Sequence, residues 1–230
     1  MPNATRFLTI SFDDGFRASS VSTGEIYERF GLRAEFNIVS TYGENNPVLY
    51  GDWALWNELA ARGHSIQPHG YNHTNKAEVS FGDARDLILR CLDTFTTNII
   101  GFHSANAVFA FPYNAFTPEL EAWLPTVFRA FRGGAGPAIN PLPTPATVKL
   151  TTSGSDRAEA FLDECVADLL GRDAGWLVYC AHGLDGEGWG PLGSEYLERL
   201  LGRLTKVENL EVLPARDVLD RFGGSRKISG

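Results

Sequence analysis

The chain of 230 residues carries 20 lysines and arginines against 28 aspartates and glutamates, which gives a formal net charge of −8. This acidic balance argues against a protein that binds the nucleic-acid backbone, since such a protein needs a basic face. Hydrophobic residues make up 43% and charged residues 21% of the chain, which argues against intrinsic disorder. A chain of this length can bury a core without disulfides or structural metals.

Three cysteines, Cys91, Cys165 and Cys180, are widely spaced, so a disulfide framework is not expected. Cys91 and Cys165 each lie in the apolar stripe of an expected helix, where packing is their default role. The N-terminal residues show neither the basic nor the apolar region of a signal peptide, and no run of about 18 apolar residues occurs. We therefore expect a cytoplasmic protein; a secreted one is the alternative if an export signal has been trimmed from the sequence.

Segments typical of strands and of helices alternate along the chain. In chain order we expect a strand at 7–12, a helix at 21–30, a strand at 34–40, a helix at 53–62, a strand at 64–67, a helix at 83–99, a strand at 108–111, a helix that Thr117 caps and Pro118 begins, a strand at 127–131, a loop at 133–145, a helix at 156–170, a strand at 176–181, a helix at 194–204, a strand at 211–213 and a helix at 215–222.

This alternation predicts an α/β fold in which helices cover a parallel sheet. About seven β/α units fit a barrel better than a short open sheet, and an open doubly wound sheet is the alternative. The alternation resumes after the loop at 133–145, so we expect a single domain over residues 1–230. No glycine-rich phosphate loop is present. In either architecture, functional residues gather where the strands end.

Three polar clusters follow expected strands. Asp13 and Asp14 come after the first strand, and adjacent carboxylates can face different partners, so that one binds a metal while the other holds a water. The alternative is an ordinary Asp-Gly turn. His69 and His73 can share a cation if their segment is a tight turn or a helix; otherwise one is a cap and the other a surface residue. His182 ends the sixth expected strand.

Two histidines and one carboxylate form a ligand set for a divalent ion that leaves positions open for water and substrate. His182 could donate a proton to a leaving group, or it could be a hydrogen-bonded core histidine. His64 and His103 lack a comparable context, so we expect them to be structural or exposed.

These three clusters resemble sequence motifs of a known enzyme family. Residues 11–15, Ser-Phe-Asp-Asp-Gly, resemble the first motif of the polysaccharide deacetylase family, which is the NodB-homology domain of carbohydrate esterase family 4. Residues 69–73, His-Gly-Tyr-Asn-His, are similar to its second motif, H-S/T-x-x-H. Residues 111–114 resemble the core of its third motif, R-x-P-Y-G, and residues 179–182 resemble its last, L-x-x-H. The order and spacing match over residues 6–222.

The resemblance implies a distorted (β/α) barrel and one divalent metal, commonly zinc, with cobalt or nickel as alternatives. Asp14, His69 and His73 would be the metal ligands. Asp13 would be the general base and His182 the general acid. Pro112 and Tyr113 would orient the substrate, with a backbone N–H near Tyr113 helping to hold the oxyanion.

The chain departs from the third motif at two positions. Ala110 stands where the family has an arginine that orients the catalytic aspartate, and Asn114 stands where it has a glycine. Arg132, after the next expected strand, is the candidate replacement; the alternative is a surface arginine. No fourth motif of the D-x-x-D-W type is found, which weakens an assignment to N-acetyl sugars specifically. Trp189, in a glycine-rich loop after His182, is expected either to line the pocket or to be an exposed loop residue.

The resulting hypothesis is a metal-dependent hydrolase of non-peptide C–N bonds that deacetylates an N-acetylated sugar, oligosaccharide or polysaccharide. One alternative on the same fold is an intracellular hydrolase of a small cyclic imide, ureide or other amide. A second is an inactive carbohydrate-binding module. The expected partner is a carbohydrate or a small amide, and no nucleic acid or membrane partner is expected. The acidic balance also makes a strongly anionic polymer a less suitable substrate.

Overall fold

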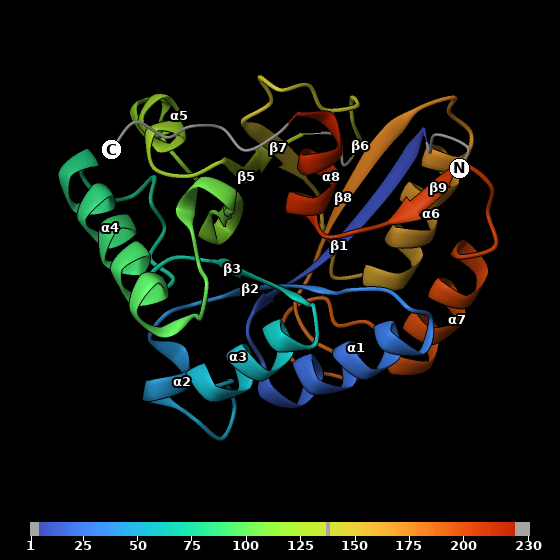
Figure 1. The fold of residues 1–230 in the computed structure, drawn as a ribbon, viewed down its shortest axis with the longest axis horizontal. Helices are drawn as coiled ribbons and strands as arrows, with labels where there is room; N and C mark the ends of the chain where they lie inside the picture. The colour runs from blue at the N-terminus through green and yellow to red at the C-terminus, as the bar shows by residue number, and fades with distance from the viewer. Residues whose placement is uncertain (1–4, 137–138, 224–230) are drawn as a thin grey trace.

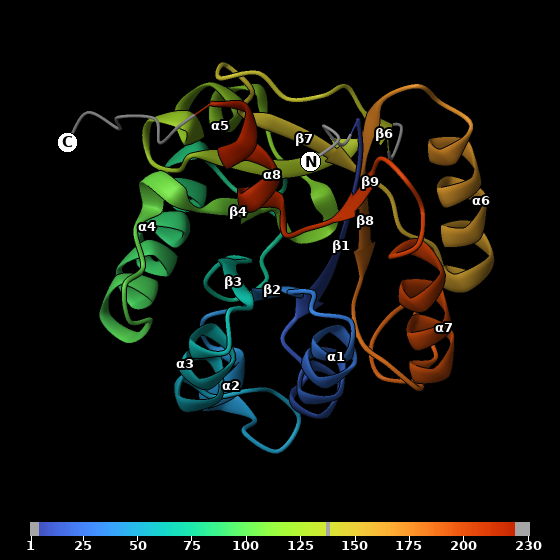
Figure 2. The ribbon, with the colours of Figure 1, turned by 45° about the vertical axis from the view of Figure 1, so that its right-hand side comes forward.

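The computed structural model describes residues 5–136 and 139–223. Its strands are β1 (Arg6–Asp14), β2 (Glu35–Ile38), β3 (Ser65–Pro68), β4 (Val108–Ala110), β5 (Ala130–Ala135), β6 (Ile139–Asn140), β7 (Lys149–Thr152), β8 (Gly175–Ala181) and β9 (Leu210–Val212). Its helices are α1 (Arg17–Arg29), α2 (Tyr42–Asn45), α3 (Trp53–Ala61), α4 (Phe81–Asn98), α5 (Pro118–Trp123), α6 (Ala158–Leu170), α7 (Ser194–Leu204) and α8 (Ala215–Phe222). The strands lie inside, with α1 and α3 on one side, α4 on a second, and α6 and α7 on a third (Figures 1 and 2).

The strands form two sheets. One has the order β3-β2-β1-β8-β6, with β9 also paired to β1, and the other has the order β4-β5-β7. All pairings are parallel except that of β6 with β8. β1 is therefore the central strand, and its partners come from both ends of the chain.

The two sheets adjoin at two seams. At one, a single bridge joins Ser153 to Tyr179 beside β7 and β8. At the other, the side-chain Oε1 of Gln67 on β3 accepts the backbone N–H of Val108 on β4 at 2.8 Å. Seven strands thus surround the interior: β3, β2, β1 and β8 from the first sheet and β7, β5 and β4 from the second. In the described residues, backbone hydrogen bonds do not close these strands into a complete ring. This α/β architecture confirms the expected fold class and shows where the barrel is distorted.

Local sequence signals explain where α3, α4 and α5 begin. The side chain of Asp52 caps α3 and that of Ser80 caps α4 by accepting backbone N–H groups. Thr117 caps α5, and Pro118 occupies its first turn, as predicted. α4 buries one helical face, including Cys91, and α6 carries the half-buried Cys165; both cysteines are free. The bounds of α7 and α8 match the predicted ones.

Other boundaries were predicted wrongly. α1 begins at Arg17, four residues before the predicted start, because its polar first turn is held by tertiary contacts of Ser19. The strand predicted at 127–131 begins only at Ala130, after a 3₁₀ turn at 124–126. The predicted loop at 133–145 contains the end of β5 and all of β6, whereas Pro137 within it lies outside the described residues. β7 and the short helix α2 were not predicted.

α8 covers the end of the strands that lies opposite their carboxyl ends. Its Val218 and Leu219 join a buried cluster with Phe7 near the start of β1 and Trp176 near the start of β8. In addition, Glu35 at the start of β2 accepts the backbone N–H of Ala215 at 2.7 Å. One end of the barrel is thereby closed by packing, which leaves the carboxyl ends of the strands for function.

Glu35 provides a test of this closure. It is buried, and burial raises its pKa to about 7, above its ordinary value of 4.5. Between these two pH values the folded protein holds a proton that the unfolded chain has lost. The free energy of unfolding should therefore fall by roughly 3 kcal/mol as the pH rises through this window.

We expect Glu35→Gln to remove this fall, because the amide still accepts the Ala215 N–H but does not titrate. Urea denaturation of both proteins at about pH 5 and pH 7.5 measures the difference, and every other titrating group is common to the two. Parallel pH profiles for the two proteins would contradict the prediction.

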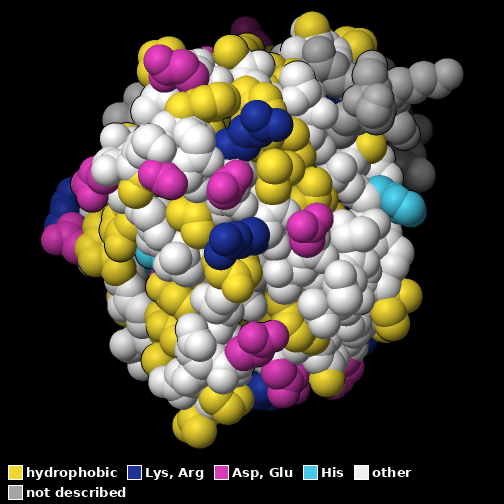
Figure 3. Space-filling view, turned by 90° about the vertical axis from the view of Figure 1, so that its left-hand side faces the viewer, with side chains coloured by type: hydrophobic (Ala, Val, Ile, Leu, Met, Phe, Trp, Pro, Cys, Tyr) yellow, Lys and Arg dark blue, Asp and Glu magenta, His cyan; other side chains and the backbone are white. Residues whose placement is uncertain are grey.

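No helix in the described part of the chain is both long enough and apolar enough to cross a bilayer. Figure 3 shows the side of the molecule on which α4 lies: acidic and basic side chains are interspersed there with apolar ones. No continuous field of either charge covers the described residues of that face.

Candidate active site

A cavity of about 530 Å³ opens where β1, β3 and β8 end. Its lining comprises Asp13, Asp14, His69, His73, Phe111, Tyr113, Asn114, Gly154, Cys180, His182 and Trp189. All three polar clusters found in the sequence therefore meet in one place, although they are separated by up to 169 residues in the chain, from 13 to 182.

The end of β1 turns sharply into this cavity. Asp14 has φ 73° and Gly15 has φ 87°, so two successive residues adopt the left-handed conformation. Aspartate tolerates that region better than most residues, and glycine is the default choice. A side chain at Gly15 would also press on Trp56 and Ile38, at 3.0 and 3.1 Å from an added Cβ. The turn sends Asp13 and Asp14 to different neighbours.

Asp14, His69 and His73 form a candidate metal site. Their ligand atoms all lie within 4.8 Å of one another. Oδ1 of Asp14 is 3.2 Å from Nε2 of His73 and 3.6 Å from Nε2 of His69. This oxygen is buried and accepts no hydrogen bond of good geometry from the described residues. A buried carboxylate oxygen facing two imidazole nitrogens is the environment that a divalent cation satisfies, so the donor set fits such an ion.

A hydrogen bond of Nδ1 fixes His69 in the tautomer that can bind a metal through Nε2. Nδ1 lies 3.0 Å from the backbone carbonyl of Ala110, which can only accept, so Nδ1 carries the proton and Nε2 keeps its lone pair. Burial lowers the pKa of His69 to about 4, although Asp13 and Asp14 oppose this shift. His69 is therefore neutral at neutral pH, as a metal ligand must be. Burial disfavours the charge of Asp14, but the neighbouring imidazoles of His73 and His69 outweigh burial and lower its pKa, so Asp14 is ionised.

Asp13 is buried and held by three donors. Its Oδ1 accepts from Nδ2 of Asn37 at 2.8 Å, and its Oδ2 accepts from Nη2 of Arg132 and from the thiol of Cys180 at 3.2 Å. Burial disfavours the carboxylate, but the charge of Arg132 beside it outweighs burial and holds the pKa of Asp13 well below its usual range. Asp13 is thus fixed in orientation and charged.

Arg132 lies where the sequence suggested a replacement for the missing motif arginine. It sits on β5 directly beside Ala110 of β4, because the two residues are paired in the parallel register. Its Nη1 also donates to Oδ1 of Asn114 at 3.3 Å. The two departures from the third motif therefore meet: the arginine comes from the neighbouring strand, and the asparagine in the glycine position holds it. Asn114 has φ 53°, a conformation that asparagine accepts more readily than most residues do.

His182 and Trp189 form another side of the cavity. His182 follows β8, and its Nδ1 is buried without a hydrogen-bond partner among the described residues. The ring of Trp189 meets it edge-on, with centroids 5.5 Å apart, and is 54% exposed. Their loop is tied to α1, because Glu187 accepts from the backbone and hydroxyl of Ser19.

Tyr113 lies on the rim, next to the metal site. Its ring centroid is 4.7 Å from that of His73, and the side chain is 65% exposed. The preceding Pro112 is buried, and Tyr113 has φ 58°, so this turn is strained. The cavity is therefore flanked by two exposed aromatic rings, Tyr113 and Trp189.

The other two histidines lie outside this cavity. His64 is buried: its Nδ1 accepts the Ala34 N–H at 3.1 Å, and its Nε2 contacts Glu28 at 3.1 Å. His103 is exposed. Both residues line a separate cavity of about 260 Å³.

Asn37 and Cys180 were missed by sequence reasoning. Alternation along a strand could have identified both. Asn37 alternates with the apolar Phe36 and Ile38, and Cys180 precedes His182 by two residues and so projects to the same side.

Comparison with known proteins agrees with this geometry. A family model described as polysaccharide deacetylase matches residues 2–124, more than half of the chain. No match was found among curated proteins.

Solved structures share the fold. A candidate polysaccharide deacetylase from Mycobacterium smegmatis is 12% identical, with a TM-score of 0.72 over 100% of this chain and 96% of that one. A family 4 acetyl xylan esterase from Clostridium thermocellum, in complex with a cobalt ion, is 16% identical, with a TM-score of 0.62 over 94% and 91%. A peptidoglycan deacetylase from Bacillus subtilis is 13% identical, with a TM-score of 0.61 over 94% and 92%. At these identities the likeness concerns the fold alone.

Proposed function

Because the chain belongs to the polysaccharide deacetylase family, we propose that it is a metal-dependent hydrolase that removes acetyl groups from the nitrogen of N-acetylated sugars in an oligosaccharide or polysaccharide. The observation that carries the proposal is that Asp14, His69 and His73, with the geometry of a metal site, lie beside His182 and the charged Asp13 in one cavity.

A divalent cation held by Asp14, His69 and His73 would polarise the scissile carbonyl as a Lewis acid. Zinc fits the mixed nitrogen and oxygen donors, as does cobalt, which the family 4 acetyl xylan esterase structure contains. The neutral state of His69 and the ionised state of Asp14 keep these donors available at neutral pH.

The remaining chemistry falls to the chain's own side chains. Asp13, oriented by Asn37 and Arg132, accepts the proton of the attacking water. His182 protonates the leaving amine, which is a poor leaving group without that proton. The backbone near Tyr113 donates to the developing oxyanion, as the resemblance implied.

The aromatic rim supports a sugar substrate. Tyr113 and Trp189 are large, exposed apolar groups that flank the cavity, and aromatic faces of this kind cover the apolar faces of sugar rings. A small cyclic imide or ureide would fit the same cavity but would use little of this exposed surface. The complete ligand set gives no support to an inactive binding module.

The test is an acetate-release screen on metal-loaded protein. We expect acetate from N-acetylated chito-oligosaccharides, loss of activity on chelation, and recovery on adding Zn²⁺ or Co²⁺. Two other substrates serve as controls, an O-acetylated xylan and a cyclic imide. A third control measures binding of the oligosaccharide to metal-free protein. If only the imide were turned over, the substrate would be a small amide and not a sugar. If only the xylan released acetate, the scissile bond would be an ester and not an amide. If the oligosaccharide bound but no substrate were turned over, the hydrolase proposal would be refuted.

A further inference from the structure

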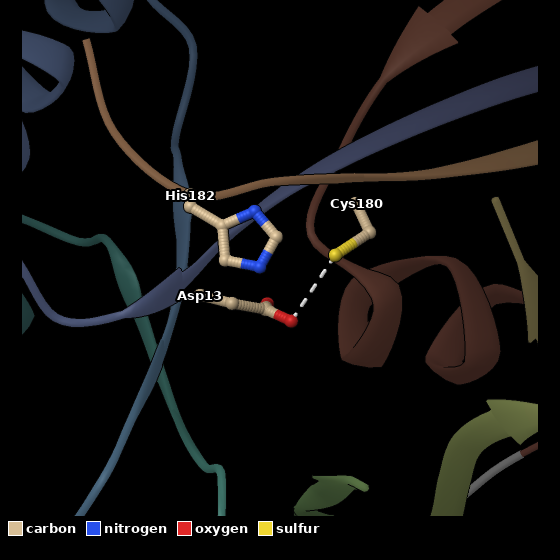
Figure 4. Close-up of side chains that lie close together, drawn as sticks. All are labelled: Asp13, Cys180 and His182. Carbon is tan, nitrogen blue, oxygen red and sulfur yellow. Dashed lines mark hydrogen bonds between the residues drawn. The ribbon is translucent and has the colours of Figure 1, made fainter. Parts of the chain in front are cut away.

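A second group of three donors lies beside the proposed metal ligands. It comprises the carboxylate of Asp13, the thiol of Cys180 and the imidazole of His182, whose donor atoms all lie within 4.8 Å of one another. Figure 4 shows the three side chains directed into a common space, with Sγ of Cys180 3.2 Å from Oδ2 of Asp13. Nothing in the proposed reaction uses the thiol.

Strand register explains why these donors converge. Ser11 on β1 is paired with Cys180 on β8, in a parallel arrangement. Asp13 and His182 each follow two residues later, so all three donors project to the same face. The sheet itself therefore places Asp13 and Cys180, and His182 is the first residue after β8.

The Cys180 thiol and the His182 imidazole both border the cavity. Cys180 forms no disulfide, and it lines the cavity with 6% of its surface exposed. His182 also lines the cavity, and Figure 4 shows its Nε2 facing Asp13 and Cys180.

We propose that Asp13, Cys180 and His182 form a second binding site for a thiophilic divalent cation such as Zn²⁺ or Co²⁺. One oxygen, one sulfur and one nitrogen donor suit these ions, whereas Mg²⁺ and Ca²⁺ prefer oxygen donors throughout. On binding, the cation replaces the thiol hydrogen of Cys180, and that proton leaves to solvent.

The charge of Arg132 predicts the order in which the two metal sites fill. Arg132 lies on the same oxygen of Asp13 that faces Cys180, so a cation here meets a neighbouring positive charge. The thiolate supplies the compensating negative charge. We therefore expect this site to fill after the Asp14–His69–His73 site. Since it engages Asp13 and His182, the second ion should inhibit the enzyme; this inhibition rests on the proposed function, whereas the binding does not.

Titration of metal-free protein with Co²⁺ tests the site. The expected result is two equivalents per chain, with a thiolate-to-cobalt charge-transfer band that grows with the second. Cys180→Ser should lose the band, keep the first equivalent and weaken the second by more than about 100-fold, beyond the effect of changing a residue that only supports a ligand. Cys165→Ser is the matched control, because Cys165 lies on α6, outside the cavity. The band should persist in Cys165→Ser and also in Cys91→Ser, since Cys91 is the other free cysteine. Together these two variants assign the band to Cys180 even if Cys180→Ser does not fold.

Two outcomes would overturn the site: a single equivalent without a charge-transfer band, or a second equivalent that Cys180→Ser leaves unchanged. Two equivalents with the band, in a protein that releases acetate from no substrate at any loading, would support the site while refuting the proposed deacetylase. The two hypotheses therefore fail separately.

Discussion

Asp14→Asn is expected to empty the Asp14–His69–His73 site, whereas Asp13→Asn, one residue earlier, should leave the first metal equivalent bound. The reason is the turn at the end of β1, which directs Asp14 to His69 and His73 and Asp13 to Asn37 and Arg132. Both variants should lose activity. Loss of Lewis-acid catalysis is worth several kcal/mol, which corresponds to about 1000-fold in kcat/KM for Asp14→Asn.

For Asp13→Asn we expect a loss of about 100- to 10,000-fold, the range for removing a general base. Metal content after dialysis and kcat/KM for acetate release are the two measurements, and each variant controls for the other because the substitutions are adjacent and isosteric. If both variants retained the first metal equivalent, or both lost it, the division of roles between the two aspartates would be wrong.

Arg132→Met is expected to act on both stability and catalysis. Removing one partner of a buried ion pair leaves Asp13 charged and unpaired, which costs about 3 to 5 kcal/mol of unfolding free energy. Without the cation, the pKa of Asp13 rises, so the acidic limb of the pH dependence of kcat/KM should move to higher pH. We also expect kcat to fall by about 100-fold, since the base loses its orientation.

A relocated arginine provides the matched control. Ala110 and Arg132 are paired on adjacent parallel strands, so their side chains project to the same face. The double variant Ala110→Arg/Arg132→Ala restores the arginine to its family position and uses the space that Arg132 vacates. It should recover at least tenfold of the lost kcat and return the acidic limb toward that of the wild type. A double variant no better than Arg132→Met would show that Arg132 does not take the place of the motif arginine.

Sequence reasoning was strongest where chemistry and periodicity coincide. The α/β class follows from regular alternation, and the strand that ends in Asp13 and Asp14 was located within two residues of each end. The positions of His69, His73 and His182 at strand ends then implied one shared site, because parallel strands bring their carboxyl ends together. The structure brings all of them to a single cavity.

Sequence reasoning was weakest where the position of a residue depends on a partner that is distant in the sequence. The first turn of α1 is polar and carries no helical pattern, yet Glu187 holds it from 168 residues away. Cys180 looked like one more apolar strand residue until the register set it opposite Ser11, two residues before Asp13. Arg132 could be proposed only because a motif arginine was missing, and its contact with Asn114 depends on a turn with positive φ.

Because β1 is the central strand, its sheet cannot be completed until late in synthesis. As the nascent chain leaves the ribosome, β1 first meets β2, and its other edge stays unpaired until β8 follows more than 160 residues later. Such an open edge is prone to aggregation, so this protein should depend on chaperones more than one whose central strands are neighbours in sequence. Asp14, His69 and His73 emerge well before Arg132 and His182. All three proposed metal ligands are therefore in the growing chain before Arg132, which orients the proposed base, and before His182, the proposed acid.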